Sequence, residues 1–184
     1  TAFPKLSIKV RNEIVSAHLD ENDPETGDVN PNQTTGTHLK PEELYTWFRN
    51  REKYPDNPDY DFAIVDMRND YEYNVGHFVG SIRPTMENFR DLSKFILEIS
   101  HLKDKKVLTV CTGGVRCEKA SGYLKTQGFT DVYQLDGGMV SYMEQFPGQN
   151  FNGAMYSFDG RNVIDYDGGG HEIVGTCKNC RSEE

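Results

Sequence analysis

The chain has 184 residues, a formal net charge of −9 and a mean hydropathy of −0.70. This length allows one ordinary domain with extensions and suffices to bury a hydrophobic core. No apolar run approaches the roughly 20 residues that span a bilayer, so we expect no membrane partner. Four cysteines are too few for a disulfide scaffold and favour a reducing, cytoplasmic location. The negative charge argues against nucleic acid as a partner, because phosphate binding usually needs a basic surface.

Hydrophobic patterns predict the first elements of the chain. Apolar and polar residues alternate within residues 5–15, which predicts a strand. Residues 20–37 hold almost no apolar side chain and are typical of a loop or linker. A helix is expected to begin at Pro41, because proline suits the first helical position and two acidic residues follow it.

Strand and helix patterns alternate between residues 41 and 146. Apolar runs at 62–65, 107–110 and 132–135 predict buried strands, and helices are expected near 85–100, 117–127 and 138–146. This alternation predicts an α/β fold in which a parallel sheet carries helices on both faces. Ligands of such folds bind beyond the carboxyl ends of the strands, where Asp66, Cys111 and Asp136 lie. The tail from 148 to 184 is expected to be irregular, with one β-hairpin at most.

Residues 111–117, CTGGVRC, are the most informative stretch. They follow a predicted strand and precede a predicted helix, so Cys111 leaves the sheet and enters a small loop. Glycines let this loop turn tightly and point its N–H groups inward, and the helix start adds partial positive charge. The thiol of Cys111 is therefore expected to have a lowered pKa. The expected anion cradle consists of the backbone of Thr112, Gly113, Gly114 and Val115.

Each residue of this stretch has two interpretations. Cys111 is either a reactive sulfur or a core cysteine at the end of a strand. Arg116 either favours the thiolate or contacts a substrate phosphate, or it forms a structural ion pair with Asp66 or Glu118. Cys117 either resolves an oxidised Cys111 by forming a disulfide or is buried under the start of the helix.

Four motifs in order make the chain resemble the rhodanese-like family. They are Asp66-x-Arg68 after the first core strand, a Gly-His-x-x-Gly-Ser motif at 76–81, the Cys-x4-Arg loop at 111–116 and the strand with its Gly-Gly turn at 131–138. This resemblance covers about residues 39–146. It implies the rhodanese fold and a cysteine that carries a persulfide, as in sulfurtransferases.

The chain resembles one branch more closely, the rhodanese-like tRNA uridine hydroxylases. Residues 111–120 match its loop, segments 9–15 and 36–43 match the part before the domain, and 156–161 with 177–180 match its tail. Members convert the wobble uridine of certain tRNAs to 5-hydroxyuridine in an oxygen-dependent reaction. The resemblance implies the tRNA anticodon region as a partner and Cys111 and Arg116 as catalytic residues of a cytoplasmic enzyme.

Three other functions compete with this one. A stand-alone sulfurtransferase would use a persulfide on Cys111 and a sulfur donor or carrier as partner. A phosphatase or arsenate reductase needs a loop one residue longer, so the loop here should be too tight for a tetrahedral oxyanion. A rhodanese-like binding module without chemistry is disfavoured because the cysteine is present.

Further charged residues lie near the loop in the sequence. Asp66 and Arg68 are expected mainly to bind each other and brace the loop. His77 is either a general base or a hydrogen-bonded loop histidine. Lys119 and Arg83 either contact RNA phosphates or belong to the solvated surface.

The resemblance also implies a domain organisation. Family members carry a further N-terminal domain and a longer tail, so we expect residues 1–37 to be a remnant of that domain or a linker. Residues 38–147 are then the rhodanese-like domain, and 148–184 form a cysteine-containing tail. In this tail Cys177 and Cys180 make at most half a zinc site, with His171 as a third ligand, and no other cofactor is expected.

Overall fold

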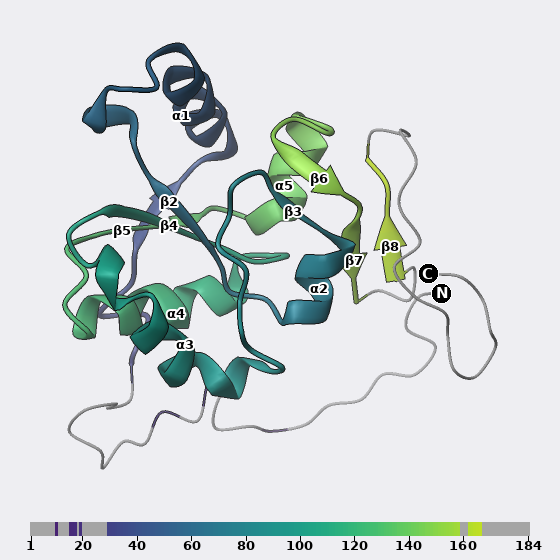
Figure 1. Ribbon diagram of the computed structural model, residues 1–184. Coiled ribbons are helices and arrows are strands. Elements are labelled where there is room, and N and C mark those ends of the chain that lie inside the picture. Colours follow the sequence, from purple (N-terminus) through teal and green to yellow (C-terminus); the bar gives the residue numbers. More distant parts are fainter. Residues whose placement is uncertain (1–9, 11–14, 18, 20–28, 159–161, 167–184) are drawn as a thin grey trace.

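The computed structural model of this chain describes residues 10, 15–17, 19, 29–158 and 162–166 (Figure 1). Its centre is a four-stranded sheet with the strand order β1-β5-β4-β2, in which every neighbouring pair is parallel. The strands are β1 (Thr37–Leu39), β2 (Ala63–Asp66), β4 (Lys106–Val110) and β5 (Asp131–Leu135). The prediction of a parallel α/β sheet is confirmed.

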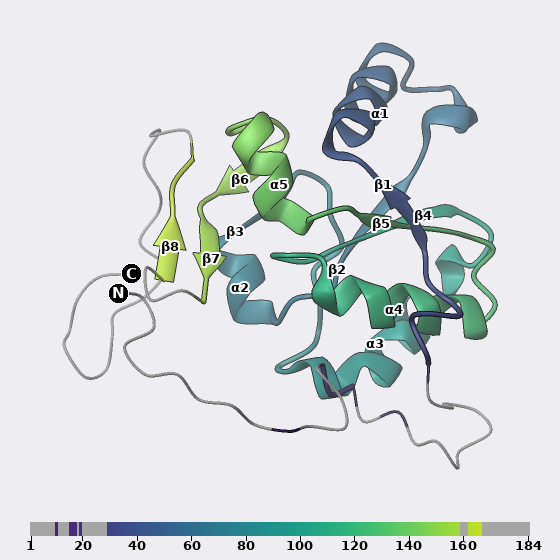
Figure 2. The ribbon, with the colours of Figure 1, turned by 180° about the vertical axis from the view of Figure 1, so that it is seen from behind.

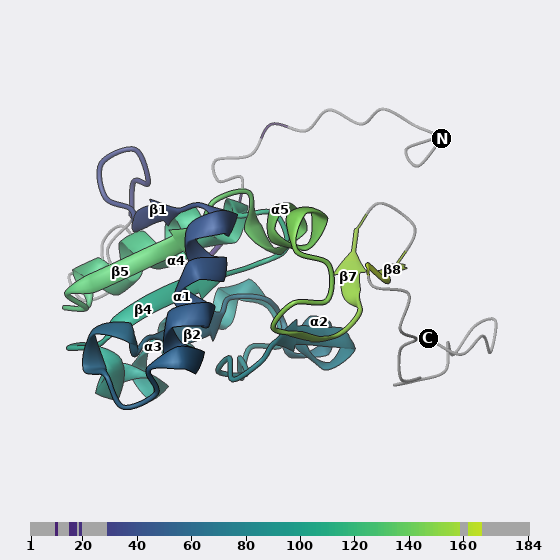
Figure 3. The ribbon, with the colours of Figure 1, turned by 90° about the horizontal axis from the view of Figure 1, so that it is seen from above.

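Helices cover both faces of this sheet, and Figure 3 shows α1 lying across one of them. Side chains of α1 (Pro41–Lys53) and α5 (Gly138–Gln145) pack on one face, and those of α3 (Leu92–Glu98) and α4 (Val115–Thr126) pack on the other. Successive residues of β4 serve both cores, because Val107 contacts the α3–α4 side and Leu108 the α1–α5 side. A sheet covered on both faces requires such continuously apolar strands.

Smaller elements lie beside the central sheet (Figure 2). They are α2 (Asp70–Val75), the antiparallel pair β3 (Gly76–Phe78) and β6 (Phe151–Gly153), the hairpin of β7 (Met155–Ser157) with β8 (Asn162–Ile164), and the 3-10 turns at Pro58–Tyr60, Phe89–Asp91 and Ser100–Leu102. The hairpin expected in the tail is present. None of the helices in the described part of the chain is long and apolar enough to cross a membrane.

One expected helix differs in its extent, and one expected strand lies almost entirely outside the described residues. The single helix expected over 85–100 is wrong in its extent, because α3 covers only its middle and 3-10 turns flank it. The side chain of Asn88 accepts a hydrogen bond from the N–H of Arg90 at 3.0 Å, which starts a 3-10 turn at the point where a longer helix would continue backwards. The strand expected within residues 5–15 lies almost entirely outside the described residues.

The carboxyl ends of the parallel strands meet at one edge of the sheet. Asp66 ends β2, Cys111 follows β4 and Asp136 follows β5, as the sequence predicts. Helices α4 and α5 both begin at this edge, and the N–H of Met67 donates to the carbonyl of Val110 across it at 2.8 Å. Helix starts and strand ends are therefore gathered around Cys111, where folds of this class bind ligands.

Candidate functional site

The loop from Cys111 to Gly114 joins β4 to α4. Gly114 has a φ of 85°, a left-handed conformation that favours glycine. The start of α5 donates two backbone hydrogen bonds, at 2.9 and 3.1 Å, to the carbonyls of Cys111 and Thr112. Gly138 permits this approach, because a Cβ there would lie 2.5 to 2.7 Å from loop backbone atoms. The two helix starts thus hold the loop between them.

The thiol of Cys111 is buried but surrounded by donors. Its residue is only 1% exposed and belongs to the core on the α3–α4 side of the sheet. Hydrogen bonding from the thiol of Cys117 is the largest influence that lowers its pKa, and the backbone N–H groups of Cys117 and Arg116 act in the same direction. These bonds, together with the charge of Arg116, outweigh burial and lower the pKa of Cys111 to about 6. The burial fits a core cysteine and the lowered pKa fits a reactive sulfur, so the reactive role of Cys111 stays a prediction.

Backbone N–H groups of α4 contribute to the lowered pKa of this sulfur. The cradle from the backbone of Thr112 to Val115 stays a prediction, and the N–H groups that lower the pKa of Cys111 belong to Arg116 and Cys117. Both lie in the first turn of α4, at the positive end of the helix dipole. The chain carries Cys111 beneath the start of α4, beside Cys117 in the same core.

The pKa of the Cys117 thiol is shifted in the opposite direction to that of Cys111. Burial and the hydrogen bond to Cys111 raise the pKa of its thiol well above the ordinary value, so it stays protonated and can donate. Both cysteines are free and buried. Their contact would suit disulfide formation after oxidation of Cys111, and the resolving role of Cys117 stays a prediction.

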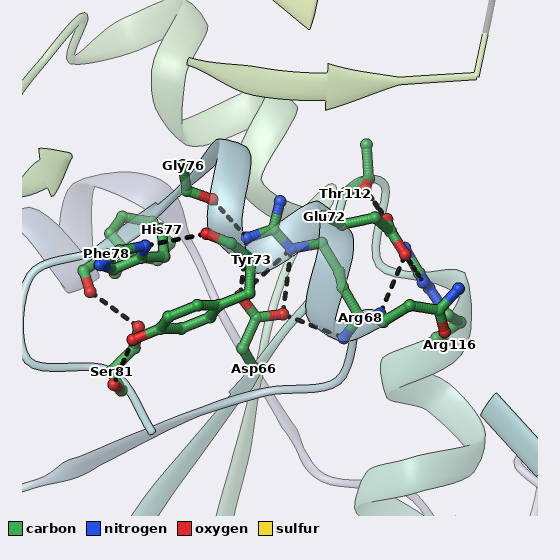
Figure 4. Close-up of polar contacts among 11 residues, drawn as sticks. Asp66, Arg68, Glu72, Tyr73, Gly76, His77, Phe78, Ser81, Thr112 and Arg116 are labelled. Atoms are coloured by element: carbon green, nitrogen blue, oxygen red, sulfur yellow. Dashed lines mark hydrogen bonds and ion pairs between the residues drawn. The ribbon is translucent and has the colours of Figure 1, made fainter. Parts of the chain in front are cut away.

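Arg116 forms an ion pair, but with neither Asp66 nor Glu118, the two carboxylates expected from the sequence. Its Nη1 and Nη2 atoms donate to the two carboxylate oxygens of Glu72 at 2.7 and 2.8 Å (Figure 4). Nη2 also donates to the hydroxyl of Thr112 at 3.3 Å. Burial opposes the charge of Arg116, but the bonds to Glu72 and its negative charge raise the pKa of Arg116 above its ordinary value. Arg116 therefore locks α4 and the cysteine loop onto α2.

Glu72 is the site residue that the sequence reasoning missed. It is fully buried in α2, and it also accepts the N–H of Asn69 at 3.0 Å. An Asn followed by Glu three residues later is the signature of a capping box at a helix start. That signal could have indicated α2, but the pairing with Arg116 depends on the packing of α2 against α4.

Asp66 and Arg68 bind each other, as predicted. Arg68 Nη2 and Asp66 Oδ2 lie 2.7 Å apart, and both side chains are fully buried. Arg68 Nη2 also donates to the carbonyl of Gly76 at 2.6 Å, which ties the end of β2 to β3 (Figure 4). Among the described residues Arg68 Nη1 finds no hydrogen-bond partner.

The remaining candidates lie away from the sulfur or outside the described residues. His77 Nδ1 contacts the carbonyl of Tyr73 at 2.9 Å, and the two rings stack 4.0 Å apart, which fits the hydrogen-bonded histidine. Lys119 is buried, so its expected place on the solvated surface is wrong, and its contact with RNA phosphates stays a prediction. The expected zinc ligands His171, Cys177 and Cys180 lie outside the described residues.

Comparisons with known proteins agree with this geometry. The model of the rhodanese-like domain family matches residues 47–145. The tRNA uridine(34) hydroxylase of Cytophaga hutchinsonii is 42% identical over 179 residues, covering 97% of this chain and 52% of that protein. The same enzyme of Listeria welshimeri is 46% identical over 177 residues, covering 95% of this chain and 51% of that protein.

Among solved structures, the rhodanese-like domain from an Anabaena protein is 18% identical, with a TM-score of 0.49, and the match covers 82% of this chain and 100% of that domain. The chain spans about half the length of the curated relatives that it matches. The family model, which matches more than half of the residues and contains the whole cysteine loop, shows that the chain belongs to the rhodanese-like family.

Proposed function

We propose that this chain is the rhodanese-like part of a cytoplasmic enzyme that hydroxylates the wobble uridine of tRNA to 5-hydroxyuridine. One observation carries this proposal: identity of 42 to 46% to proteins named tRNA uridine(34) hydroxylase extends over 95 to 97% of the chain. The similarity therefore continues on both sides of the domain matched at 47–145. A rhodanese-like domain alone would not distinguish between functions, because one fold hosts many.

Cys111 is the proposed reactive residue of this enzyme. A thiol whose pKa lies near 6 is largely ionised at neutral pH, and the thiolate is the nucleophilic form. The same N–H groups would stabilise a persulfide anion on this sulfur, much as backbone amides stabilise an oxyanion. Arg116 supports the anion through its charge and through its bonds to Glu72 and Thr112. Dependence on oxygen is proposed from the resemblance to the hydroxylase branch.

A deletion strain of the source organism tests the proposal. Its tRNA is digested and the wobble nucleosides are weighed, with the full-length wild-type gene or a Cys111→Ala gene supplied back. The wild type should restore 5-hydroxyuridine and its derivatives, and Cys111→Ala should not. Unchanged nucleosides in the deletion strain would remove the proposed reaction, and restoration by Cys111→Ala would remove the proposed nucleophile.

A packing control is needed because Cys111 is buried. Cys111→Ala should cost about 1 kcal/mol of stability, as small losses of core volume do. Val107→Ala trims the same core near the opposite end of β4. This control should lose at least as much stability and retain activity. If Val107→Ala is inactive as well, the loss of activity in Cys111→Ala is explained by impaired folding.

A sulfurtransferase is the second candidate, favoured by the ionised sulfur in a rhodanese-like loop. With thiosulfate as donor, the thiolate of Cys111 would attack the outer sulfur and form a new S–S bond. The old S–S bond would break, and sulfite would leave with its electron pair. Intact-protein mass spectrometry should then show a reducible gain of one sulfur atom that Cys111→Ala lacks. Sulfur loading without any effect on wobble nucleosides would favour this candidate.

A further inference from the structure

An aromatic cluster is exposed beside the cysteine loop. Tyr71 of α2 and Phe158, directly after β7, both contact Tyr156 of β7 edge to face, with ring centroids 5.4 and 5.1 Å apart. Tyr71 is 44% exposed and Phe158 is 58% exposed. We call Tyr71, Tyr156 and Phe158 the aromatic platform. Neighbouring exposed aromatic rings on a folded protein are typical of a binding surface.

The platform is connected directly to the residues around Cys111. The guanidinium carbon of Arg116 lies 5.8 Å from the ring centroid of Phe158, within cation–π range. Tyr71 precedes Glu72, the carboxylate that holds Arg116. Anything stacked on these rings would therefore lie next to the start of α4 and the cysteine loop.

A cavity continues from the platform toward the loop. It has a volume of about 380 Å³, and its lining includes Thr112, Tyr156 and Ser157. Apolar side chains of α5 and the β7–β8 hairpin form much of the remaining wall, namely Val140, Met155 and Ile164. Such a volume and such a mixture of polar and apolar walls suit a small planar ligand.

We propose that the aromatic platform stacks unpaired bases of an RNA loop and so positions a neighbouring base at the cavity beside Thr112. This proposal rests on the proposed function, which requires a single base of RNA to approach the cysteine loop. Proteins recognise unpaired RNA bases by stacking them on aromatic rings and on arginine.

The position of the platform favours RNA over a protein partner. A protein bound on these rings would cover the side of the loop that Thr112 and the cavity occupy. A stacked RNA loop instead brings its own base to that side. Binding of a protein is therefore the alternative outcome of the test.

The chain offers a matched control surface. Tyr54 is 43% exposed and stacks on Tyr60 with ring centroids 5.6 Å apart. It follows the end of α1, which begins at the carboxyl edge of the sheet after β1 and returns to the opposite edge. Tyr54→Leu removes an exposed aromatic ring of similar environment far from the loop.

The test uses this chain and an RNA stem-loop that carries 5-iodouridine at the wobble position of its loop. Affinity is measured by fluorescence anisotropy, and the photo-cross-linked residue is identified by mass spectrometry. Phe158→Leu and Tyr71→Leu should each weaken binding about tenfold, as loss of a stacking ring does, and Tyr54→Leu should not. The cross-link should map to the platform or to the lining of the cavity. Thermal unfolding of each variant checks that these exposed substitutions leave the fold intact.

Several outcomes would overturn the proposal that the platform stacks RNA bases. They are absence of wild-type binding, equal affinity of all variants, and a cross-link outside these residues. Equal affinity combined with lost function of Phe158→Leu in the deletion strain would indicate a protein partner. The proposed reaction is judged separately by the wobble nucleosides of the deletion strain. If the platform variants lose RNA binding but the deletion strain keeps its wobble nucleosides, the platform proposal stands and the proposed reaction is rejected. If all the variants restore the wobble nucleosides, only the platform proposal is rejected.

Discussion

Two arginine–carboxylate pairs lie near the same edge of the sheet and differ in what they connect. Asp66 and Arg68 are two residues apart, fully buried, and joined to the carbonyl of Gly76. Glu72 and Arg116 come from different helices, and part of the Arg116 side chain reaches the surface. Asp66 with Arg68, the inner pair, fixes the shape of one strand end. Glu72 with Arg116, the outer pair, holds the loop that carries the sulfur. Similar chemistry thus serves packing in one place and the candidate site in the other.

The largest effect is expected when the inner pair is broken. Arg68→Met leaves the carboxylate of Asp66 buried without its partner, which typically costs about 3 to 5 kcal/mol of stability. Urea unfolding measures this loss. Asp66→Leu combined with Arg68→Met removes both charges and should recover most of the stability. A single variant as stable as the wild type would show that the pair does not hold the strand end.

Breaking the outer pair should act on stability and on the sulfur together. Arg116→Met leaves Glu72 without its bidentate partner and should cost about 1 to 3 kcal/mol. It should also raise the pKa of Cys111, because the charge of Arg116 favours the thiolate. The ultraviolet absorbance of the thiolate, followed against pH, measures that pKa. Arg116→Lys keeps the charge and should shift the pKa less than Arg116→Met. An unchanged titration in Arg116→Met would remove the distinction between the two pairs.

The sequence predicts the inner pair and the loop because their signals are local. Asp66 and Arg68 are two residues apart, and the glycines and cysteines of the loop follow one another directly after an apolar run. Buried parallel strands are also recognisable, since each is a short continuous stretch of apolar residues. Local patterns therefore identify the sheet, the edge on which the site lies and the cysteine itself.

The outer pair and the burial of Cys111 depend on tertiary packing. Glu72 and Arg116 are 44 residues apart, and nothing in either segment indicates the other. The depth of Cys111 follows from the way α4 lies over the end of β4, which also brings the N–H groups of Arg116 and Cys117 near the sulfur. Strands of three residues such as β3 and β6 are too short to show an alternating pattern.

Removing the thiol of Cys117 should affect the sulfur with little effect on either ion pair. That thiol is the largest cause of the lowered pKa of Cys111, so Cys117→Ala should raise this pKa toward the ordinary value of about 8.5. The thiolate present at neutral pH should then shrink, while stability falls by about 1 kcal/mol. Cys117→Ser retains a donor and should shift the titration less. A Cys111 titration that is identical in Cys117→Ala and the wild type would assign the low pKa to the backbone and Arg116 alone.

The smallest effect is expected at a third carboxylate, which is partly exposed. It tests whether the stability lost on removing a charged partner depends on burial. Glu118 accepts hydrogen bonds from Thr35 at 2.9 Å and Gln134 at 3.0 Å and pairs with His38 at 2.8 Å, so it joins α4 to β1. Burial opposes its charge, but these partners lower the pKa of Glu118 below its ordinary value.

Glu118→Ala should therefore cost about 1 kcal/mol or less at neutral pH, since pairs of this exposure contribute little. A carboxylate whose pKa is lowered by folding stabilises the protein above its ordinary pKa of about 4.3, and that contribution disappears as the pH falls through the lowered value. The difference in unfolding free energy between wild type and Glu118→Ala should accordingly be greatest near neutral pH and shrink in acid. Because Glu118 is bonded toward β1, the thiolate titration of Cys111 should stay as in the wild type. A shifted titration in this variant would mean that any charge removed from the first turn of α4 affects the sulfur, and the special role of Arg116 and Glu72 would be lost.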